Sequence, residues 1–272
     1  MTTFWIIDAF IFGACIGSFL NVIIWRWPRE HSINGRSECP HCKHNLAWYD
    51  LLPVVSFLLL RGRCRYCKKP VSIRYPLIES FTAVLFALAA WQISPHDLLS
   101  WLLFAKFAIA IAVCVAVFVI DFEHYIILDR IVYPMAIAML VLAIGLDLAS
   151  VQPIWQLTSH TISSLLAAAF AFIPFWFLWY VSMGKWMGFG DVKFVGLMGL
   201  ILGLPSIAVG LFASFTIGAV VGLILIVFGK KQLSSKLPFG TFLSICTIVT
   251  LFFGPQLWTL YWTLFAAGTG PM

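Results

Sequence analysis

Long apolar runs alternate with short polar segments along almost the whole chain. The runs cover residues 4–25, 77–91, 98–120, 131–146, 162–181, 192–204, 207–228 and 239–265. A helix that crosses the hydrocarbon core of a bilayer needs about 20 apolar residues, and several of these runs are shorter. Pro205 and the glycines around it favour a short or broken helix in the sixth run. The pattern therefore predicts an all-α polytopic membrane protein with about eight transmembrane helices, or seven if 192–204 does not cross.

The composition supports a membrane protein. Of the 272 residues, 62% are hydrophobic and only 10% are charged, whereas a soluble domain carries about a quarter charged residues. So few charges cannot cover a solvent-exposed surface, and much of the surface must therefore face lipid. The first apolar run lacks the basic start and the small-residue cleavage site of a signal peptide, so we expect it to remain as a helix.

The basic residues indicate the orientation of the chain. Ten of the 17 Lys and Arg lie between Arg26 and Arg74, in the longest polar stretch. If this stretch is cytoplasmic, eight alternating spans also place the loops 121–130, 182–193 and 229–237 on the cytoplasmic side. These loops carry the other basic residues apart from Lys106, and positive residues collect on the cytoplasmic side. We therefore expect both termini outside, and we attribute the net charge of +6 to topology and anionic lipid, not to nucleic-acid binding.

The same pattern divides the chain into three parts. These are a first transmembrane helix at 1–25, a polar insertion at 26–76 and a helical core at 77–272. Lys106 falls in the middle of an apolar run, where it is either a polar partner inside the bundle or a side chain that snorkels to the interface. No role is assigned to it.

The insertion contains two Cys-x-x-Cys pairs, Cys39/Cys42 and Cys64/Cys67, separated by 21 residues. Each pair can place two thiolates on one ion through a tight turn, and two pairs complete a tetrahedral site. Four protein ligands leave no position for water, so the spacing predicts a structural zinc. The alternatives are two disulfides or free thiols, and disulfides are rare in a reducing cytoplasm.

Other metal-binding or reactive groups add little to this picture. His41 and His44 could also ligate a metal, but the four cysteines suffice. Cys15, Cys114 and Cys246 lie within apolar runs, and we expect small, inert core residues there.

Two aspartates lie at the edges of apolar runs. Asp121 ends the run 98–120, and Asp191 follows Gly188 and Gly190 directly before another run. The predicted topology places both at the cytoplasmic boundary, where an ionisable residue is a candidate for function. Both could instead cap helices or lie in loop water, but the dipole at the end of its own helix disfavours Asp121. Three other acids compete for the same role: Glu123, Asp129 and Asp147.

Two carboxylates held close together cannot both ionise, so one stays protonated while the other acts as a base. The base can take a proton from a water that attacks a peptide carbonyl, and the acid can donate to the carbonyl oxygen or to the leaving nitrogen. Such a pair cleaves peptides without a metal or a covalent intermediate. Gly188 and Gly190 remove side chains beside Asp191, which lets a substrate backbone approach closely.

A series of short motifs runs in order along nearly the whole chain. They are Gly17-Ser-Phe-Leu-Asn-Val22 with Arg26 and Pro28, the two cysteine pairs, Asp50-Leu-Leu-Pro53, Ser56, Arg61-Gly-Arg-Cys64, Ser72-Ile-Arg-Tyr-Pro76 with Glu79, Ile120-Asp121, Gly188-Phe-Gly-Asp191 with Lys193, and Pro238-Phe-Gly240. In this order the sequence resembles the prepilin peptidase family, the leader peptidases and N-methyltransferases of type IV pilus and type II secretion systems. Many members have a proline before the acid that follows the first catalytic aspartate. This chain has Ile127-Leu128-Asp129 there, and no role is carried onto Asp129.

The resemblance implies that Asp121 and Asp191 are catalytic and that Gly188, Gly190 and Lys193 form the active-site loop. It implies a bacterial inner-membrane enzyme that cleaves prepilin or pseudopilin precursors at the cytoplasmic face, after a short basic leader. It also implies methylation of the new N-terminal amine from S-adenosylmethionine. The oligomeric state and the particular pilin stay open.

The sequence contains no recognisable nucleotide-binding motif for the methyltransferase activity. The insertion is too small for a Rossmann fold, and it has no glycine-rich loop of that type. A site would have to be built from the insertion and the adjoining helix ends, where Asn21, Arg74 and Glu79 lie. These three residues could equally fasten the insertion to the bundle by hydrogen bonds. A peptidase with a decayed methyltransferase is also compatible with the sequence.

Two other function classes make different predictions. A transporter or channel would place charges near the bilayer midplane on broken helices, whereas Asp121 and Asp191 lie at one face. A scaffold that docks partners through the zinc insertion would tolerate the loss of either aspartate but not the loss of the cysteines.

Overall fold

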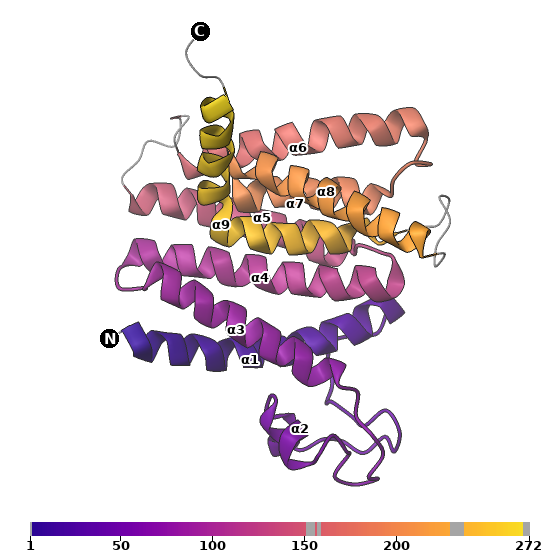
Figure 1. The fold of residues 1–272 in the computed structure, drawn as a ribbon. Helices are drawn as coiled ribbons and strands as arrows, with labels where there is room; N and C mark the ends of the chain where they lie inside the picture. Colours follow the sequence, from indigo (N-terminus) through magenta and orange to yellow (C-terminus); the bar gives the residue numbers. More distant parts are fainter. Residues whose placement is uncertain (1, 151–155, 157–158, 229–236, 269–272) are drawn as a thin grey trace. The chain divides into compact units, whose positions relative to one another are not determined.

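The structure is a computed structural model that describes residues 2–150, 156, 159–228 and 237–268 (Figure 1). In chain order its elements are α1 (Thr2–Arg26), η1 (Trp27–Arg29), η2 (Trp48–Leu51), α2 (Val55–Leu59), α3 (Arg74–Ile93), α4 (Leu98–His124), α5 (Asp129–Ala149), α6 (His160–Ser182), α7 (Phe189–Leu202), α8 (Ser206–Val227) and α9 (Phe239–Gly268). Within the described residues the only strand pairing consists of two isolated bridges, Glu38 with Asn45 and Arg63 with Pro70. The predicted all-α class is confirmed.

Seven helices in the described part of the chain are long and apolar enough to cross a membrane: α1, α3, α4, α5, α6, α8 and α9. The sixth apolar run forms α7, which has only 14 residues. At about 1.5 Å per residue this helix is roughly 21 Å long, short of the ~30 Å hydrocarbon core. It ends before Gly203, whose φ of 67° is a left-handed conformation that favours glycine, and Pro205 precedes α8. The prediction of a short helix at this place is confirmed.

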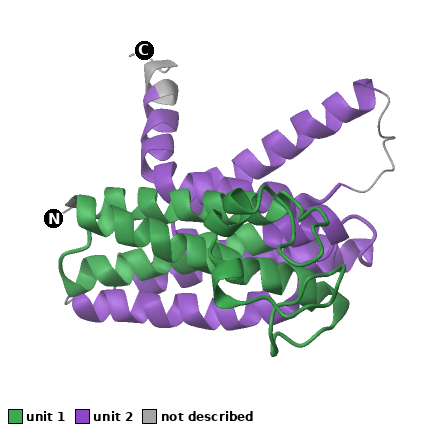
Figure 2. Ribbon diagram, turned by 90° about the horizontal axis from the view of Figure 1, so that it is seen from below, with its two compact units in different colours: residues 1–116 green, residues 117–272 purple. Residues whose placement is uncertain are grey.

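The chain forms two compact units, residues 1–116 and 117–272, and α4 contributes to both (Figure 2). The predicted insertion at 26–76 falls entirely within the first unit. The sequence predicted three segments with boundaries at residues 25 and 76, based on the spans and the polar insertion. This division stays a prediction.

In the first unit α1 packs along α3, with close contact at two glycines. A Cβ atom at Gly17 would lie 2.7 Å from the Cα of Glu79, and one at Gly13 would lie 2.7 Å from the Cβ of Phe86. This close approach brings Asn21 of α1 and Glu79 of α3 to the end of the helix pair from which the insertion extends. Cys15 lies roughly 200° around α1 from both glycines, which turns it away from α3. It is exposed, so the prediction of a core position is wrong for Cys15, whereas Cys114 and Cys246 are buried as expected.

In the second unit α6 packs on α7 and α8 packs on α9, while α5 contacts α6 and α7. The α6–α7 contact depends on Gly199, where a Cβ atom would lie 2.5 Å from backbone atoms of Ala168. Helix α9 contains Pro255 and bends sharply (Figure 1), because a proline inside a helix removes one hydrogen bond and clashes with the preceding turn.

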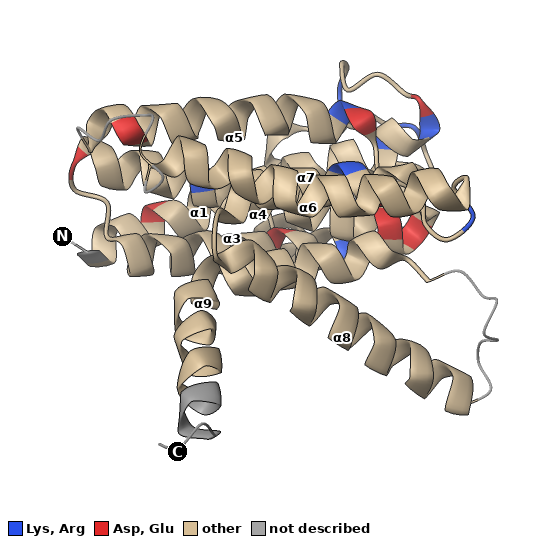
Figure 3. Cartoon of the chain, turned by 90° about the horizontal axis from the view of Figure 1, so that it is seen from above, with Lys and Arg blue, Asp and Glu red and all other residues tan. Residues whose placement is uncertain are grey.

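Charged residues are sparse along the helices, which are tan over most of their length in Figure 3. Lys106 is an exception: it lies within α4 and is only 8% exposed. Three of the basic residues used for the predicted orientation lie outside the described residues: Lys230, Lys231 and Lys236.

Candidate functional site

Asp121 lies near the end of α4 and is 4% exposed. Its Oδ2 atom accepts hydrogen bonds from the backbone N–H of Thr241 at 2.8 Å and from the Thr241 hydroxyl at 3.2 Å. Thr241 belongs to the first turn of α9, where backbone N–H groups have no partner within the helix. The positive end of α9 therefore stabilises the carboxylate that the end of α4 would disfavour. Asp121 thus caps the start of α9, a helix distant in sequence. Helix capping therefore explains the position of Asp121 better than we expected.

Asp191 lies in the first turn of α7, which begins after Gly188. It precedes the apolar part of this helix and is outside the seven candidate spans. Burial, and then the charge of Asp121, raise the pKa of Asp191 to about 7. The two carboxylates are therefore near enough to influence each other, as two acids that share a site do.

Ile127, in the loop between α4 and α5, lies between the elements that carry the two aspartates. A Cβ atom at Gly190 would be 3.1 Å from the Ile127 Cβ, and one at Gly240 would be 2.8 Å from its Cδ1. The Gly240 Cβ would also be 3.0 Å from Asp121 Oδ2. The absence of side chains at Gly190 and Gly240 lets this loop pack against the starts of α7 and α9. At Gly190 the space is filled by Ile127.

Lys193 and Asp129 form an ion pair between the N-terminal part of α7 and the start of α5. The Lys193 ammonium also lies 5.1 Å from the ring centre of Phe189 and 5.7 Å from that of Tyr133, within the range of cation–π attraction. Lys193 thus holds α7 to α5 two residues after Asp191.

Two of the competing acids have other partners. Asp147 is fully buried and accepts hydrogen bonds from the backbone N–H groups of His160 at 2.6 Å and Thr161 at 2.9 Å, so it caps the start of α6. Glu123 lies 3.9 Å from the His124 ring nitrogen.

The four cysteines of the insertion form one cluster, with their sulfur atoms within 4.8 Å of one another. All four are free thiols, and the Sγ atoms of Cys39 and Cys67 are 3.9 Å apart. Four sulfurs at about 2.3 Å from a tetrahedral zinc would be about 3.8 Å apart, so the donor set fits zinc. Burial opposes ionisation of Cys39, but backbone hydrogen bonds from Cys42 and His41 lower its pKa to about 7.

The two cysteine turns have the same backbone hydrogen bonds. In the first, Cys39 N donates to His44 O at 3.0 Å and Lys43 N to Cys39 O at 2.9 Å. In the second, Cys64 N donates to Lys69 O at 2.9 Å and Lys68 N to Cys64 O at 3.0 Å. Lys43 and Lys68 both have φ near 60°. The pairs are thus two equivalent knuckles that face each other.

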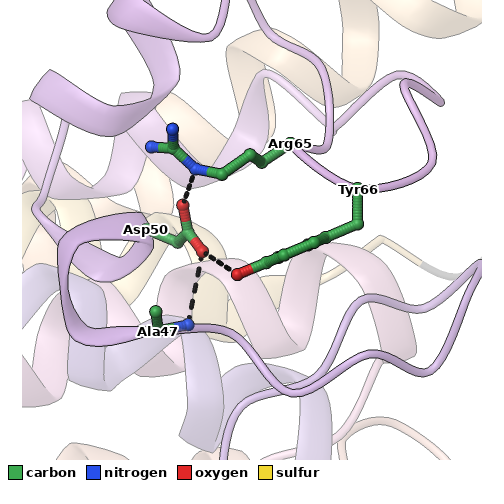
Figure 4. Close-up of polar contacts among 4 residues, drawn as sticks. All are labelled: Ala47, Asp50, Arg65 and Tyr66. Atoms are coloured by element: carbon green, nitrogen blue, oxygen red, sulfur yellow. Dashed lines mark hydrogen bonds and ion pairs between the residues drawn. The ribbon is translucent and has the colours of Figure 1, made fainter.

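Asp50 fastens the second knuckle to η2 (Figure 4). Its Oδ1 accepts a hydrogen bond from Arg65 Nε at 2.6 Å, and its Oδ2 accepts from the Tyr66 hydroxyl at 3.1 Å and from Ala47 N at 3.3 Å. Burial alone would raise the pKa of Asp50, but the hydrogen bonds from Arg65, Tyr66 and Ala47 outweigh it and hold this pKa below its usual value. Arg65 and Tyr66 are the two residues between the second pair of cysteines, so Asp50 orients the ligands on both sides.

The three residues considered for methyl transfer lie where the insertion joins α1 and α3. Asn21 Nδ2 donates to Tyr75 O at 3.2 Å, and Glu79 Oε2 accepts from Val54 N at 2.7 Å. Arg74 lies with its guanidinium 5.3 Å from the Tyr75 ring centre. Asn21 and Glu79 line a cavity of about 560 Å³ in the first unit, and Arg74 lies outside its lining.

Several residues that shape these sites were not identified from the sequence. Thr241 directly follows the Pro238-Phe-Gly240 motif at the start of an apolar run. A polar residue in the first turn of a helix was the available signal, because such turns carry unpaired N–H groups. Ile127 and Tyr66 had no sequence signal, since their importance depends on contacts with distant residues.

Comparisons with known proteins agree with this geometry. A family model described as Bacterial Peptidase A24 N-terminal domain matches residues 11–93, and one described as Type IV leader peptidase family matches residues 107–223. The first range contains the four cysteines, and the second contains both aspartates.

Relatives with one shared name match most of the chain. A prepilin leader peptidase/N-methyltransferase of Legionella pneumophila is 32% identical over 93% of this chain and 93% of its own length. A relative of the same name from Aeromonas hydrophila is 30% identical over 94% of this chain and 93% of its own length. One of Myxococcus xanthus is 35% identical over 80% of this chain but 62% of that relative's length. No solved structure matches. On the strength of the two matched regions and these relatives, the chain belongs to the type IV leader peptidase family.

Proposed function

We propose that this chain is a membrane aspartic endopeptidase that removes the leader of type IV prepilin-like precursors and then methylates the new N-terminal amine. The relatives carry both activities in their name. The observation that supports the peptidase most directly is the pair of aspartates from α4 and α7, in which burial and then the charge of Asp121 raise the pKa of Asp191.

The two aspartates have different surroundings, which supports different roles. Asp121 accepts two hydrogen bonds from Thr241, and such bonds favour the charged form, so we assign it as the general base. Asp191 has a pKa of about 7 and is assigned as the general acid. Asp121 takes a proton from water, the hydroxyl oxygen bonds to the scissile carbonyl carbon, and Asp191 gives its proton to the leaving nitrogen as the C–N bond breaks.

The helices α1, α3, α4, α5 and α6 suffice to orient the site. Alternate crossings put the insertion, the α4–α5 loop and the α6–α7 loop on one side of the membrane, and most of the basic residues lie in or next to these segments. Positive residues collect on the cytoplasmic side. We therefore place the cysteine cluster and both aspartates at the cytoplasmic face of a bacterial inner membrane, where water and the precursor's leader are available. Prepilins or pseudopilins of pilus or type II secretion systems are the proposed substrates.

Zinc and S-adenosylmethionine complete the proposal. The four cysteines would hold zinc as a structural ion, because four protein ligands leave no open position for a water. S-adenosylmethionine would supply the methyl group. Gly188, Gly190 and Lys193 would form the loop that sets the position of Asp191.

The test is cleavage of a prepilin-like substrate in membranes by wild type, Asp121→Asn and Asp191→Asn. Loss of a general acid or base lowers the rate by about 100- to 10,000-fold, and methyl transfer onto a pre-cleaved substrate should persist in both variants. Glu123→Gln is the matched control, since this acid lies two residues from Asp121. Full cleavage by either Asn variant would show that the pair is not catalytic and would favour a scaffold or another acid.

A further inference from the structure

The insertion between α1 and α3 contains an apolar segment that is too short to cross a bilayer. Residues 51–60 carry no charge, and Ser56 is their only polar side chain. They include the end of η2 and all of α2. A span needs about 20 apolar residues, whereas a run of about ten is typical of a segment that is buried in protein or lies at a membrane interface. The surroundings of α2 distinguish these two cases.

One side of α2 faces the protein and the other does not. Ser56, Phe57 and Leu60 line the cavity of about 560 Å³ in the first unit and are partly covered. The exposed apolar side chains of this segment and of η2 form what we call the apolar patch: Trp48, Leu51, Leu52, Val55, Leu58 and Leu59. Leu59 is 76% exposed. Exposed apolar side chains that follow one another so closely in the chain indicate an interaction surface.

The patch lies beside α3 and not beyond its end. Directly before α2, Val54 N donates to Glu79 Oε2 at 2.7 Å. Glu79 is six residues, about 9 Å along the helix axis, past Ile73, the residue before α3. Exposed apolar side chains follow one face of α3 from that point, with Ile73 65% and Leu77 59% exposed. Because such a face of a membrane-spanning helix is turned to lipid, α2 begins at a depth where α3 contacts the bilayer.

The first loop of the insertion lies further out. Gly17 is the α1 residue that touches Glu79, since a Cβ atom there would lie 2.7 Å from the Glu79 Cα. Arg26 is nine residues, about 14 Å, beyond Gly17, and its guanidinium donates to Ile33 O at 2.7 Å. The loop around Ile33 is thus held beyond the level at which α2 begins. Figure 1 shows α2 alongside α1 and α3 within their length, and the loops of the insertion lie within the length of the green helices in Figure 2.

Exposed basic residues follow the patch. Arg61 comes just after α2, and the turn closed by the bridge between Arg63 and Pro70 carries more of them. The exposed cations of this stretch that form no ion pair with a described residue are Arg61, Arg63, Lys68 and Lys69. Asp50, the nearest acid along the chain, has a side chain only 3% exposed and is paired with Arg65. An apolar surface followed at once by unpaired positive charge is complementary to anionic lipid.

The charges also decide between two occupants of the patch. The leader that the family resemblance implies for the precursor is basic, and these four cations would repel it. An anionic leaflet attracts the same cations. Trp48, which is 76% exposed, is of a residue type enriched at the boundary between hydrocarbon and headgroups. Each of these observations favours the bilayer as the surface that covers the patch.

We propose that the apolar patch lies in the interfacial layer of the bilayer, with the four cations on anionic headgroups. A segment at an interface is buried by about 5–10 Å, which agrees with the ~9 Å between Ile73 and Glu79 along α3. The insertion is then held to the membrane at three places: α1, α3 and the patch. The two cysteine knuckles, one before and one after the patch in the chain, stay at the membrane surface. This placement goes beyond the proposed cleavage and methylation and depends on neither.

The test uses the full chain in nanodiscs of equal parts phosphatidylglycerol and phosphatidylcholine, with a benzophenone amino acid in place of Leu59. Irradiation should give covalent lipid adducts at this position. The matched control replaces Ile33, an apolar residue of the same insertion that is 38% exposed. We expect at least about ten times fewer adducts at position 33, since a side chain outside the interfacial layer meets few lipid tails. Leu88, on the exposed face of α3, is the positive control.

Labelling at position 88 shows that the first unit is embedded, so a lack of lipid adducts at position 59 in the same nanodiscs overturns the proposal. Equal adduct yields at positions 59 and 33 overturn it as well. Adducts at position 59 to an added precursor or to a second copy of the chain, in place of lipid, would assign the patch to a protein partner. A lack of label at position 88 too would overturn the membrane placement of the whole first unit.

Separate labels on the two lipids test the charges. Adducts at position 59 should favour phosphatidylglycerol, and Arg61→Gln should lower this preference by up to about fivefold, because each basic residue near an anionic surface strengthens binding by about that factor. Lys43→Gln removes a cation already paired with Glu38 and should leave the preference unchanged. Equal labelling of the two lipids before any substitution would contradict the role of the cations. Neither measurement requires cleavage or methyl transfer, so failure of the proposed function would be seen separately.

Discussion

Thr241 donates both its backbone N–H and its hydroxyl to the same oxygen of Asp121, a residue 120 positions earlier in the chain. The start of α9 thus holds the carboxylate at the end of α4. This contact joins the last apolar run to the proposed catalytic pair, and it gives Asp121 a different environment from Asp191.

The Thr241 hydroxyl should matter for cleavage. Thr241→Val keeps the backbone N–H and the shape of the side chain but removes one of two hydrogen bonds to Asp121. A hydrogen bond to a charged group contributes roughly 1.5–3 kcal/mol, so we expect kcat to fall about 10- to 100-fold. Thr241→Ser should restore most of the rate. Thr247→Val, which removes a hydroxyl bonded only within α9, is the control; equal rates for the two valine variants would contradict the role of Thr241.

The cleavage rate should depend on pH through Asp191. Its pKa is raised to about 7 by burial and by Asp121, and a general acid must be protonated. The rate should therefore be highest below this pKa and should fall as the pH rises through it, by about tenfold per unit at higher pH. Measurement of kcat/KM between about pH 5 and 9 checks this. A rate that stays constant up to about pH 9 would exclude Asp191 as the acid.

Gly240 should not tolerate a side chain. A Cβ atom there would lie 2.8 Å from Ile127 Cδ1 and 3.0 Å from Asp121 Oδ2, so Gly240→Ala displaces one or both. We expect at least a tenfold loss of cleavage with normal membrane expression, since overpacking costs about 1–3 kcal/mol. Ile127→Val removes the nearer methyl group and should recover part of the activity in the double variant.

Gly218→Ala in α8 is the matched control for this substitution. The nearest atom to an added Cβ there is 3.6 Å away, an ordinary contact. If Ile127→Val gives no recovery, the packing of this loop is not what limits Gly240→Ala.

The purified protein should contain on the order of one zinc per chain, and Cys64→Ser should lose it. Asp50→Asn should release zinc faster to a chelator, because Asp50 holds both residues between Cys64 and Cys67. Glu38→Gln breaks only the exposed pair with Lys43 and should release zinc at the wild-type rate. Protein with two disulfides and no metal would disprove the zinc site.

The Asp50 network should also respond to acid. The hydrogen bonds of Asp50 lower its pKa below 3.8, so the charged form binds its partners better in the folded state. The stability that Asp50 contributes is complete above this value and is lost as the pH falls through the folded pKa. Differential scanning calorimetry of wild type and Asp50→Asn should show melting temperatures that converge at low pH; a constant difference would contradict this.

The sequence by itself was sufficient for the features that depend on local pattern. Apolar runs of about 20 residues identify the long spans, and Pro205 marks the short helix before it, because these signals need no knowledge of distant contacts. The spacing of the cysteine pairs predicted the cluster, since two turns of this kind can close around one ion wherever they meet. The positions of Asp121 and Asp191 at the ends of apolar runs made them candidates.

Only the tertiary structure decided which groups meet. The contacts of Thr241 with Asp121, of Ile127 with Gly190 and Gly240, and of Asp147 with the start of α6 join residues that no local pattern connects. It also created the cavity beside Asn21 and Glu79 and turned Cys15 away from the α1–α3 contact. The physical reason is that hydrophobic periodicity is a property of each segment, whereas hydrogen-bond partners and close packing depend on how the segments fold together.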